Sequence, residues 1–297
     1  MKKLCIGLMV FISIRLNAQD SLSVVKNDSA TVISSAITTT DDNNTKKYYS
    51  GSSPYTTSFK KDGPITLGLI GLNVLGLQLI QNKKGLTPAE LATKTRDKVP
   101  SFDRGNVGYY DESIDEASYP VMYSAYALPV AVALLNGKER NRFGQVLVLY
   151  TETMAVTGAL FSITAGSINR SRPLVYSAEA PMSTRLSNNS QRSFFAGHTA
   201  SVASSTFFMA KVFSDFNPDS KLKPVVWAVA AAVPSYIGYS RYKSGHHFLS
   251  DNIIGYTVGA AAGILIPHWH KTSKMKNVSI VPNVGSNYTG MALTYKF

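Results

Sequence analysis

Six apolar segments of about 15 to 23 residues follow one another along this 297-residue chain. Apolar runs of that length are too long for β-strands and are typical of helices. They are also close to the lower limit for crossing a lipid bilayer, and polar residues such as Glu152 and Lys211 occur within them. Length therefore leaves open whether the helices span a membrane or fill a globular core. The segments cover residues 65–80, 119–135, 146–168, 194–213, 225–239 and 251–268.

The start of the chain has the composition of an export signal. Two lysines precede an apolar run over residues 4–14, and Ala18 follows as a small residue at a cleavage position. We expect a signal peptide over residues 1–18. The chain's single cysteine lies inside this segment, so a mature chain would have no disulfide.

The regions on either side of the apolar segments differ from them in composition. Residues 19–61 are rich in Ser, Thr, Asn, Asp and Lys without an apolar period, and we expect a disordered polar tether there. Residues 62–273 then form one helical domain. Over residues 274–297 the apolar period changes to two, which predicts a short β-hairpin tail.

The formal net charge of +12 favours anionic ligands or an acidic membrane surface. We find no nucleic-acid-binding module and no basic stripe with interleaved aromatic residues, so nucleic acid is not an expected partner. His268 and His270 point away from each other on a helix, and we interpret them as helix-end cations rather than metal ligands. We predict no metal site and no cofactor. The acidic residues at 111–116 are expected to face water.

The segment over residues 240–251 places an arginine, a histidine and an aspartate at spacings that phosphoryl chemistry can use. If a helix begins here, His247 and Asp251 lie four residues apart on one face, and the carboxylate can hold one ring nitrogen of the imidazole. The other ring nitrogen is then unprotonated and can act as a nucleophile. Arg241 adds a planar guanidinium that suits the equatorial oxygens of a phosphoryl group.

Two earlier segments add residues of the same chemistry. Gly197 and His198 stand at the start of an apolar helix, where free backbone N–H groups favour an anion, and His198 is a candidate general acid. Arg170 and Arg172 follow the end of another apolar helix, and Pro173 prevents that helix from continuing. We expect these helix ends to converge on one anion.

The pattern resembles the type 2 phosphatidic acid phosphatase and vanadium haloperoxidase superfamily, whose three motifs are K-x6-R-P, P-S-G-H and S-R-x5-H-x3-D. The third motif is complete in Ser240, Arg241, His247 and Asp251. The second is kept only in Gly197 and His198, with Phe195 and Ala196 in place of its proline and serine. The first keeps Arg172 and Pro173, but Ala165 stands where the family has lysine. The likeness spans roughly residues 62–270, and the specificity of the third motif makes a chance match improbable.

The resemblance implies an all-α six-helix bundle and a hydrolysis in two steps without a metal. His247, aligned by Asp251, attacks phosphorus, and His198 protonates the leaving group. The phosphate oxygens are held by Arg172, Arg241, the Gly197 N–H and, among further candidates, Ser240 and Arg170. A lipid phosphate, a prenyl pyrophosphate or a soluble phosphomonoester fits this chemistry.

The missing lysine and serine weaken the catalytic interpretation, because each lost donor typically costs about 10²–10³ in rate. Arg170 or Lys243 is a candidate replacement for the lysine. Two alternatives stay open. One is a phosphate-binding envelope protein with little or no activity, and the other is a vanadate-dependent haloperoxidase.

We expect the chain in the cell envelope with its site outside the cytoplasm, but the predicted features conflict. A cleaved signal leaves the new N-terminus outside, and three crossings would then carry Arg172 to the cytoplasm. Either the signal is not cleaved, or one helix does not cross, or the bundle lies in the periplasm without spanning the membrane.

Overall fold

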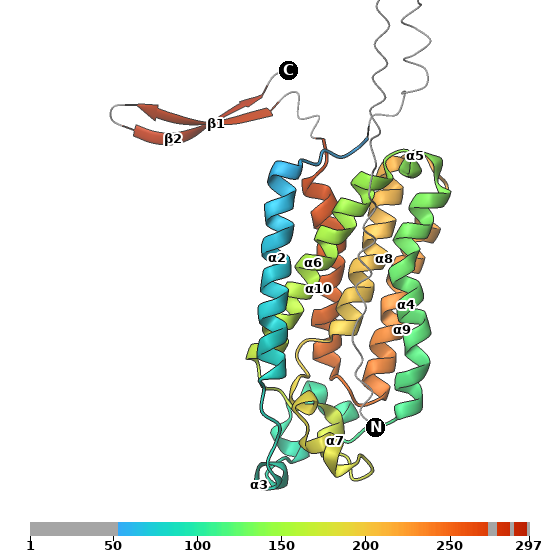
Figure 1. Ribbon diagram of the computed structural model, residues 1–297, viewed down its shortest axis with the longest axis vertical. Coiled ribbons are helices and arrows are strands. Elements are labelled where there is room, and N and C mark those ends of the chain that lie inside the picture. Colours follow the sequence, from blue (N-terminus) through green and yellow to red (C-terminus); the bar gives the residue numbers. More distant parts are fainter. Residues whose placement is uncertain (1–52, 273–277, 286–287, 296–297) are drawn as a thin grey trace, which may run out of the picture. The chain divides into compact units, whose positions relative to one another are not determined.

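The computed structural model describes residues 53–272, 278–285 and 288–295, and the predicted signal peptide and most of the predicted tether lie outside these ranges. Six long helices run side by side in a bundle (Figure 1). Each of the six apolar segments forms one of them, so the described part of the chain is predominantly helical. The six are α2 (Phe59–Gln81), α4 (Glu112–Leu135), α6 (Phe143–Ser167), α8 (Gly197–Phe216), α9 (Lys223–Lys243) and α10 (Leu249–Trp269).

The helix count is higher than the predicted six, because short helices form in the connections. The short α-helices are α3 (Pro88–Ala92), α5 (Gly137–Arg140) and α7 (Met182–Leu186). Four 3₁₀ segments accompany them, η1 (Arg96–Lys98), η2 (Ser101–Asn106), η3 (Pro173–Tyr176) and η4 (Asn188–Gln191). None of these pieces has an apolar period long enough to be recognised in the sequence.

Helix α8 lies at the centre of the bundle and contacts α4, α6, α9 and α10. Its hydroxyl groups are satisfied by neighbouring helices: Ser204 accepts from Thr157 at 2.9 Å, and Thr206 donates to the carbonyl of Ala230 at 2.9 Å. Because buried hydroxyls need such partners, these contacts fix how α6 and α9 pack on α8.

Helix α10 packs against α8 through a row of glycines at four-residue spacing. A Cβ at Gly255, Gly259 or Gly263 would lie 2.0–2.5 Å from a backbone carbonyl oxygen of α8. Only glycine permits this approach, which brings the first turns of α8 and α10 close together. Both turns carry predicted site residues.

Most helix boundaries differ from the expected ones by a few residues, and α4 begins at Glu112 rather than at residue 119. Helix α2 begins at Phe59, inside the predicted polar tether, because the Asp62 carboxylate accepts a hydrogen bond from the Ser58 N–H at 2.6 Å and stabilises the first turn. Helix α9 continues to Lys243 and so includes Ser240 and Arg241. The third motif therefore starts inside a helix rather than in a loop.

Four of the described helices, α2, α4, α6 and α10, are long and apolar enough to cross a membrane by length and composition. Helix α2 exposes many large apolar side chains, among them Leu67, Leu72 and Val74. Exposed apolar rows of this kind are typical of surfaces that face lipid. We therefore treat the bundle as membrane-associated.

The strands β1 (Val278–Gly285) and β2 (Tyr288–Tyr295) follow the helices. They pair antiparallel, with Val278 opposite Tyr295 and Gly285 opposite Tyr288. Both strands lie within the predicted tail of residues 274–297.

Two of the three short α-helices, α3 and α7, lie at one end of the bundle, and α5 lies at the other end (Figure 1). The end with α3 and α7 is the one that matters for the predicted site. Helices α6 and α9 end here, and α8 and α10 begin here. This arrangement collects the three motif segments at one end of the bundle.

Candidate active site

A cavity of about 200 Å³ lies where α6, α8 and the connecting loops meet. The α6 side of the cavity is mostly apolar, and its lining residues are spaced three or four apart, as on one face of a helix. The polar side of the cavity is formed by predicted site residues. Of the eight predicted site residues, Arg172, Gly197, His198 and His247 line it. The full lining is Met154, Thr157, Gly158, Phe161, Arg172, Gly197, His198, Ser201 and His247.

Arg172 is the cation at this cavity. Its side chain is 9% exposed, and among the described residues no carboxylate pairs with it. Its Nε is buried without a hydrogen-bond partner in the described structure. A second, smaller cavity of about 90 Å³, lined also by Asn189, Ser190 and His246, reaches Arg172 from the loop side. A buried guanidinium with unused donors between two cavities is an anion-binding arrangement.

His247 lies in the loop between α9 and α10 and is 3% exposed. Its Nδ1 lies 2.6 Å from the backbone carbonyl oxygen of Ser193. A carbonyl oxygen only accepts, so Nδ1 carries the proton. Burial, followed by the charge of Arg172, holds the pKa of His247 well below its usual value, so the ring is neutral and Nε2 has a free lone pair.

The prediction that Asp251 directly holds His247 is wrong in this structure. The two residues do not share a helix face, because α10 begins at Leu249 and His247 precedes its N-cap, Phe248. The Asp251 carboxylate accepts instead from the N–H of Phe248 at 2.9 Å and from Oγ of Ser193 at 2.6 Å. Asp251 therefore caps α10 and anchors Ser193, whose carbonyl holds His247.

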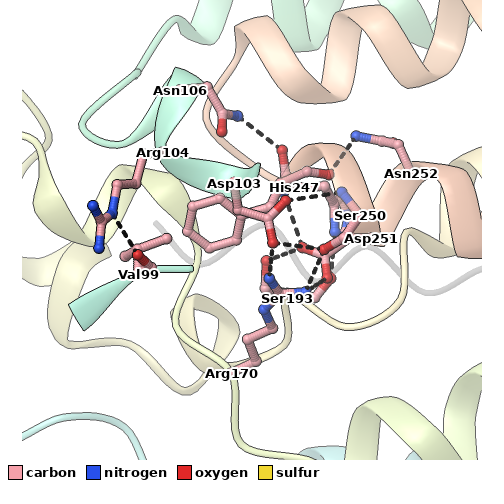
Figure 2. Close-up of polar contacts among 11 residues, drawn as sticks. Val99, Asp103, Arg104, Asn106, Arg170, Ser193, His247, Ser250, Asp251 and Asn252 are labelled. Carbon is pink, nitrogen blue, oxygen red and sulfur yellow. Dashed lines mark hydrogen bonds and ion pairs between the residues drawn. The ribbon is translucent and has the colours of Figure 1, made fainter. Parts of the chain in front are cut away.

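Arg170 is also placed differently from the prediction. Its guanidinium pairs with Asp251 and, at 2.6 Å, with Asp103, and it donates to Oγ of Ser250 at 3.0 Å. Figure 2 shows these contacts among Asp103, Arg170, Ser193, Ser250 and Asp251. With two carboxylates as partners, Arg170 joins the loop after α6 to α10 and is not available to a phosphate.

His198 is in the first turn of α8, and Arg241 lies behind it. Nη1 of Arg241 is 3.2 Å from Nδ1 of His198. A guanidinium only donates, so Nδ1 of His198 accepts and its proton is on Nε2. His198 and His247 therefore have opposite tautomers, one with N–H and the other with a lone pair at Nε2.

Arg241 does not line either cavity that Arg172 lines, contrary to its predicted role as a phosphate ligand. It is 1% exposed, pairs with the Asp115 carboxylate, and donates to the Asp115 carbonyl oxygen at 3.0 Å and to Oγ of Ser118. Asp115 is correspondingly half-buried against Arg241 rather than facing water as expected. The Arg241–Asp115 ion pair forms because burying the guanidinium without a neutralising carboxylate would raise the free energy of the folded state.

Ser240 is likewise withdrawn from the site, since its Oγ donates to the carbonyl of Tyr236 at 3.0 Å within α9. Gly197, by contrast, is required by packing. A Cβ there would lie 2.5 Å from the ring of Phe161. Its N–H is at the open N-terminal end of α8, as predicted for a phosphate contact.

Two of the three positions that depart from the family motifs, Ala165 and Ala196, are fully buried. Ala165 continues the cavity-lining face of α6 one turn beyond Phe161, and its carbonyl accepts from Nζ of Lys83 at 2.6 Å. Ala196 is the N-cap of α8, which has no side-chain cap. Lys243, the other candidate replacement for the motif lysine, lies 5.0 Å from the ring centre of Tyr109 and lines neither of the two cavities at Arg172.

Sequence reasoning missed three supporting residues. Ser193 holds His247 through its carbonyl, and Asp103 accepts from the N–H of Ser250 at 2.9 Å while pairing with Arg170. Asn106 donates at 2.9 Å to the His247 carbonyl. Asp103 and Asn106 lie in η2, far from the motifs in sequence, and no periodic pattern marks them.

The charges around the cavity are unbalanced toward positive. Burial, then the charge of Arg192, lowers the pKa of Arg172 to about 9. Burial, then Arg241, Arg172 and Arg192, lowers the pKa of His198 to about 3. At neutral pH the histidines are thus neutral beside charged arginines, and a bound anion would relieve the repulsion that contributes to both shifts.

A family model described as the PAP2 superfamily matches residues 146–275, which include all three motif segments. Over these residues the chain is similar to the PAP2 superfamily. A search of curated proteins found no match. The solved structure of a transmembrane PAP2 type phosphatidylglycerolphosphate phosphatase from Bacillus subtilis is 18% identical, with a TM-score of 0.41, over 68% of this chain and 94% of that chain.

Proposed function

We propose that this protein is a phosphatase that hydrolyses a phosphomonoester or pyrophosphate, most simply that of a lipid, through a phosphohistidine. The observation that carries the proposal is the unpaired, buried guanidinium of Arg172 in the same cavity as His198 and His247. The opposite tautomers of the two histidines supply a nucleophile and a proton donor on that cavity.

In the first step, the lone pair on Nε2 of His247 forms a bond to phosphorus while the bond from phosphorus to the leaving oxygen breaks. Arg172 and the N–H of Gly197 stabilise the charge on the equatorial oxygens. Asp251 contributes as a positioning residue through Ser193, because Ser193 holds the ring of His247.

The proton for the leaving oxygen comes from His198. Phosphate binding opposes the charge of Arg172 and so raises the pKa of His198. The substrate enters as its monoanion, and the proton it carries passes to Nδ1 of His198, which gives up its contact with Arg241. His198 then donates its Nε2 proton to the leaving oxygen. In the second step the bare Nε2 accepts a proton from water as the water oxygen bonds to phosphorus and the bond from phosphorus to Nε2 of His247 breaks. His198 returns its Nδ1 proton to the released phosphate, which leaves as the monoanion.

A lipid substrate is favoured by the walls of the cavity. Met154, Gly158 and Phe161 lie on α6, which is one of the four helices long enough to cross a membrane. A leaving group with an acyl or prenyl chain can therefore lie along α6 while its phosphate meets Arg172. We place the helical domain at residues 62–273 and propose an envelope location with the site outside the cytoplasm.

The test is release of inorganic phosphate by the detergent-solubilised full-length chain from a panel of lipid and soluble phosphates. We expect turnover of lipid phosphates that vanadate inhibits. Halide oxidation with vanadate and peroxide, without phosphate release, would identify a haloperoxidase instead. Phosphate binding without either reaction would identify a non-catalytic phosphate-binding protein.

A further inference from the structure

We propose that Arg192 is the second cation of the phosphate site, in the role for which the PAP2 motif has a lysine at the position of Ala165. This inference rests on the proposed phosphatase function. It names a binding residue outside the three motif patterns, and it explains how a site can work after the loss of the motif lysine.

The other cations near the site are already committed to partners. Arg170 has two carboxylate partners, and Arg241 pairs with Asp115. Lys83, next to the vacant lysine position, donates to the carbonyls of Ala165 and Ile168 at 2.6 Å each and of Gln191 at 3.3 Å. An ammonium group has three N–H donors, so Lys83 has none left for a phosphate.

Arg192 has donors to spare. Its Nε is buried without a hydrogen-bond partner in the described structure, and no carboxylate there pairs with it. Arg192 is not among the residues that line either cavity at Arg172, but its Nη2 donates to the side chain of Asn189, which lines the smaller one. A buried, charged N–H without an acceptor is costly unless a ligand supplies one.

The backbone places Arg192 alongside the first motif. The N–H of Arg172 donates to the Ser190 carbonyl at 2.8 Å, and the N–H of Ser193 donates to the Arg170 carbonyl at 3.0 Å. Arg192 is therefore carried by the segment that pairs with residues 170–172. The next residue, Ser193, holds His247.

The charge of Arg192 also reaches the reacting groups. It is a cause of the lowered pKa of both Arg172 and His198, after burial in each case. Two guanidinium groups of like charge, neither of them paired with a carboxylate among the described residues, destabilise each other. An anion bound between them removes that cost. In the family pattern, the motif lysine and arginine supply a pair of positive charges for an anion in the same way.

The experiment measures the affinity of the full-length protein in detergent for inorganic phosphate, by equilibrium dialysis, together with kcat and KM. We expect Arg192→Ala to weaken phosphate binding and raise KM by about 10- to 100-fold, as for loss of a charged hydrogen bond. Arg192→Lys should recover most of the loss. Asn189→Ala should show a smaller loss in the same direction, because it frees Arg192 without removing its charge.

Arg140→Ala is the matched control, since it removes an exposed arginine from α5 at the other end of the bundle (Figure 1). It should bind phosphate as the wild type does. Phosphate affinity within twofold of wild type in Arg192→Ala, with a large loss in Arg172→Ala, overturns the inference and leaves the proposed function intact. No loss in Arg172→Ala either would contradict the proposed function itself. If Arg192→Ala does not fold, Arg192→Gln, which removes the charge and keeps a side-chain amide donor, decides the question by the same measurement.

Discussion

Nη1 of Arg241 lies 3.2 Å from Nδ1 of His198, and this contact determines which nitrogen of His198 carries the proton. The motif resemblance implies that Arg241 binds phosphate. In the structure, Asp115 and Ser118 hold its guanidinium behind His198. The arginine of the third motif therefore contacts His198, the proposed proton donor, and does not line the cavities at Arg172.

A change at Arg241 should lower the rate more than the affinity. We expect Arg241→Gln combined with Asp115→Asn, which removes the ion pair without leaving a buried charge, to reduce kcat by about 10²-fold. Phosphate affinity by equilibrium dialysis should stay within about threefold of wild type, a margin set by the variable worth of single contacts. A loss of affinity as large as that in Arg172→Ala would show that Arg241 binds the phosphate.

The pH dependence of kcat/KM should follow the second phosphate pKa of the substrate. With the pKa of His198 lowered to about 3 and that of His247 well below its usual value, both histidines are neutral at neutral pH in the free protein. The required proton then enters with the monoanion of the substrate, whose second pKa is about 6. We expect kcat/KM to be level below about pH 6 and to fall tenfold per pH unit above it.

Two soluble substrates whose second phosphate pKa values differ by about one unit check this pH prediction. The break in kcat/KM should move with the substrate. A break that stays at the same pH for both substrates would assign it to a group on the protein.

Ala165 stands where the motif has lysine, so the lysine can be restored and its effect measured. Ala165 continues the cavity-lining face of α6, so Ala165→Lys should place a cation at the phosphate. In the wild type we expect little gain or some loss, because Arg192 already supplies that charge. In Arg192→Ala the same substitution should raise kcat/KM about tenfold, a fraction of what a well-placed donor provides. Equal effects of Ala165→Lys on kcat/KM in both backgrounds would show that residues 165 and 192 act independently.

Ala196 stands where the motif has serine, and we expect the substitution of serine there to change the stability of the protein. Ala196→Ser adds a side-chain acceptor at the uncapped start of α8, which typically stabilises by about 1 kcal/mol. We expect the melting temperature in detergent to rise by about 2–4 °C. Ala200→Ser, in the next turn of the same helix, is the control and should not raise it. An equal rise in both variants would exclude capping as the cause.

Fractionation and N-terminal sequencing test the location. We expect the chain in the envelope fraction. A start near Gln19 with release by carbonate, or a carbonate-resistant chain with Met1 retained and the tether in the cytoplasm, is consistent with a site outside the cytoplasm. A start near Gln19 in a carbonate-resistant chain with α2, α4 and α6 crossing would put Arg172 in the cytoplasm and contradict the proposal.

The long helices could be predicted from the sequence because each contains a contiguous apolar run. The predicted ends are within a few residues of the observed ones for α6 and α10, where glycine, proline or a charge marks the boundary. The extension of α9 through Arg241 was not predicted, since polar residues near a helix end are equally common inside and outside the last turn.

The site was only partly predictable for a different reason. Motif spacing identified His247, His198, Arg172 and Gly197, which share the cavity. Spacing could not show that Asp251 and Arg170 pair with each other, or that Asp103 completes the network. Those contacts join segments about 70 to 150 residues apart, and a backbone carbonyl such as that of Ser193 leaves no trace in the sequence.

The central claim is that His247 attacks phosphorus, and trapping the intermediate tests it most directly. Rapid quenching of the full-length protein with a labelled substrate, followed by peptide mapping under alkaline conditions, should place acid-labile phosphate on His247. His247→Ala should carry no label and have no turnover, whereas His246→Ala, which lines the other cavity, should keep both. Label retained in His247→Ala, or located on His246 in the wild type, would contradict the account.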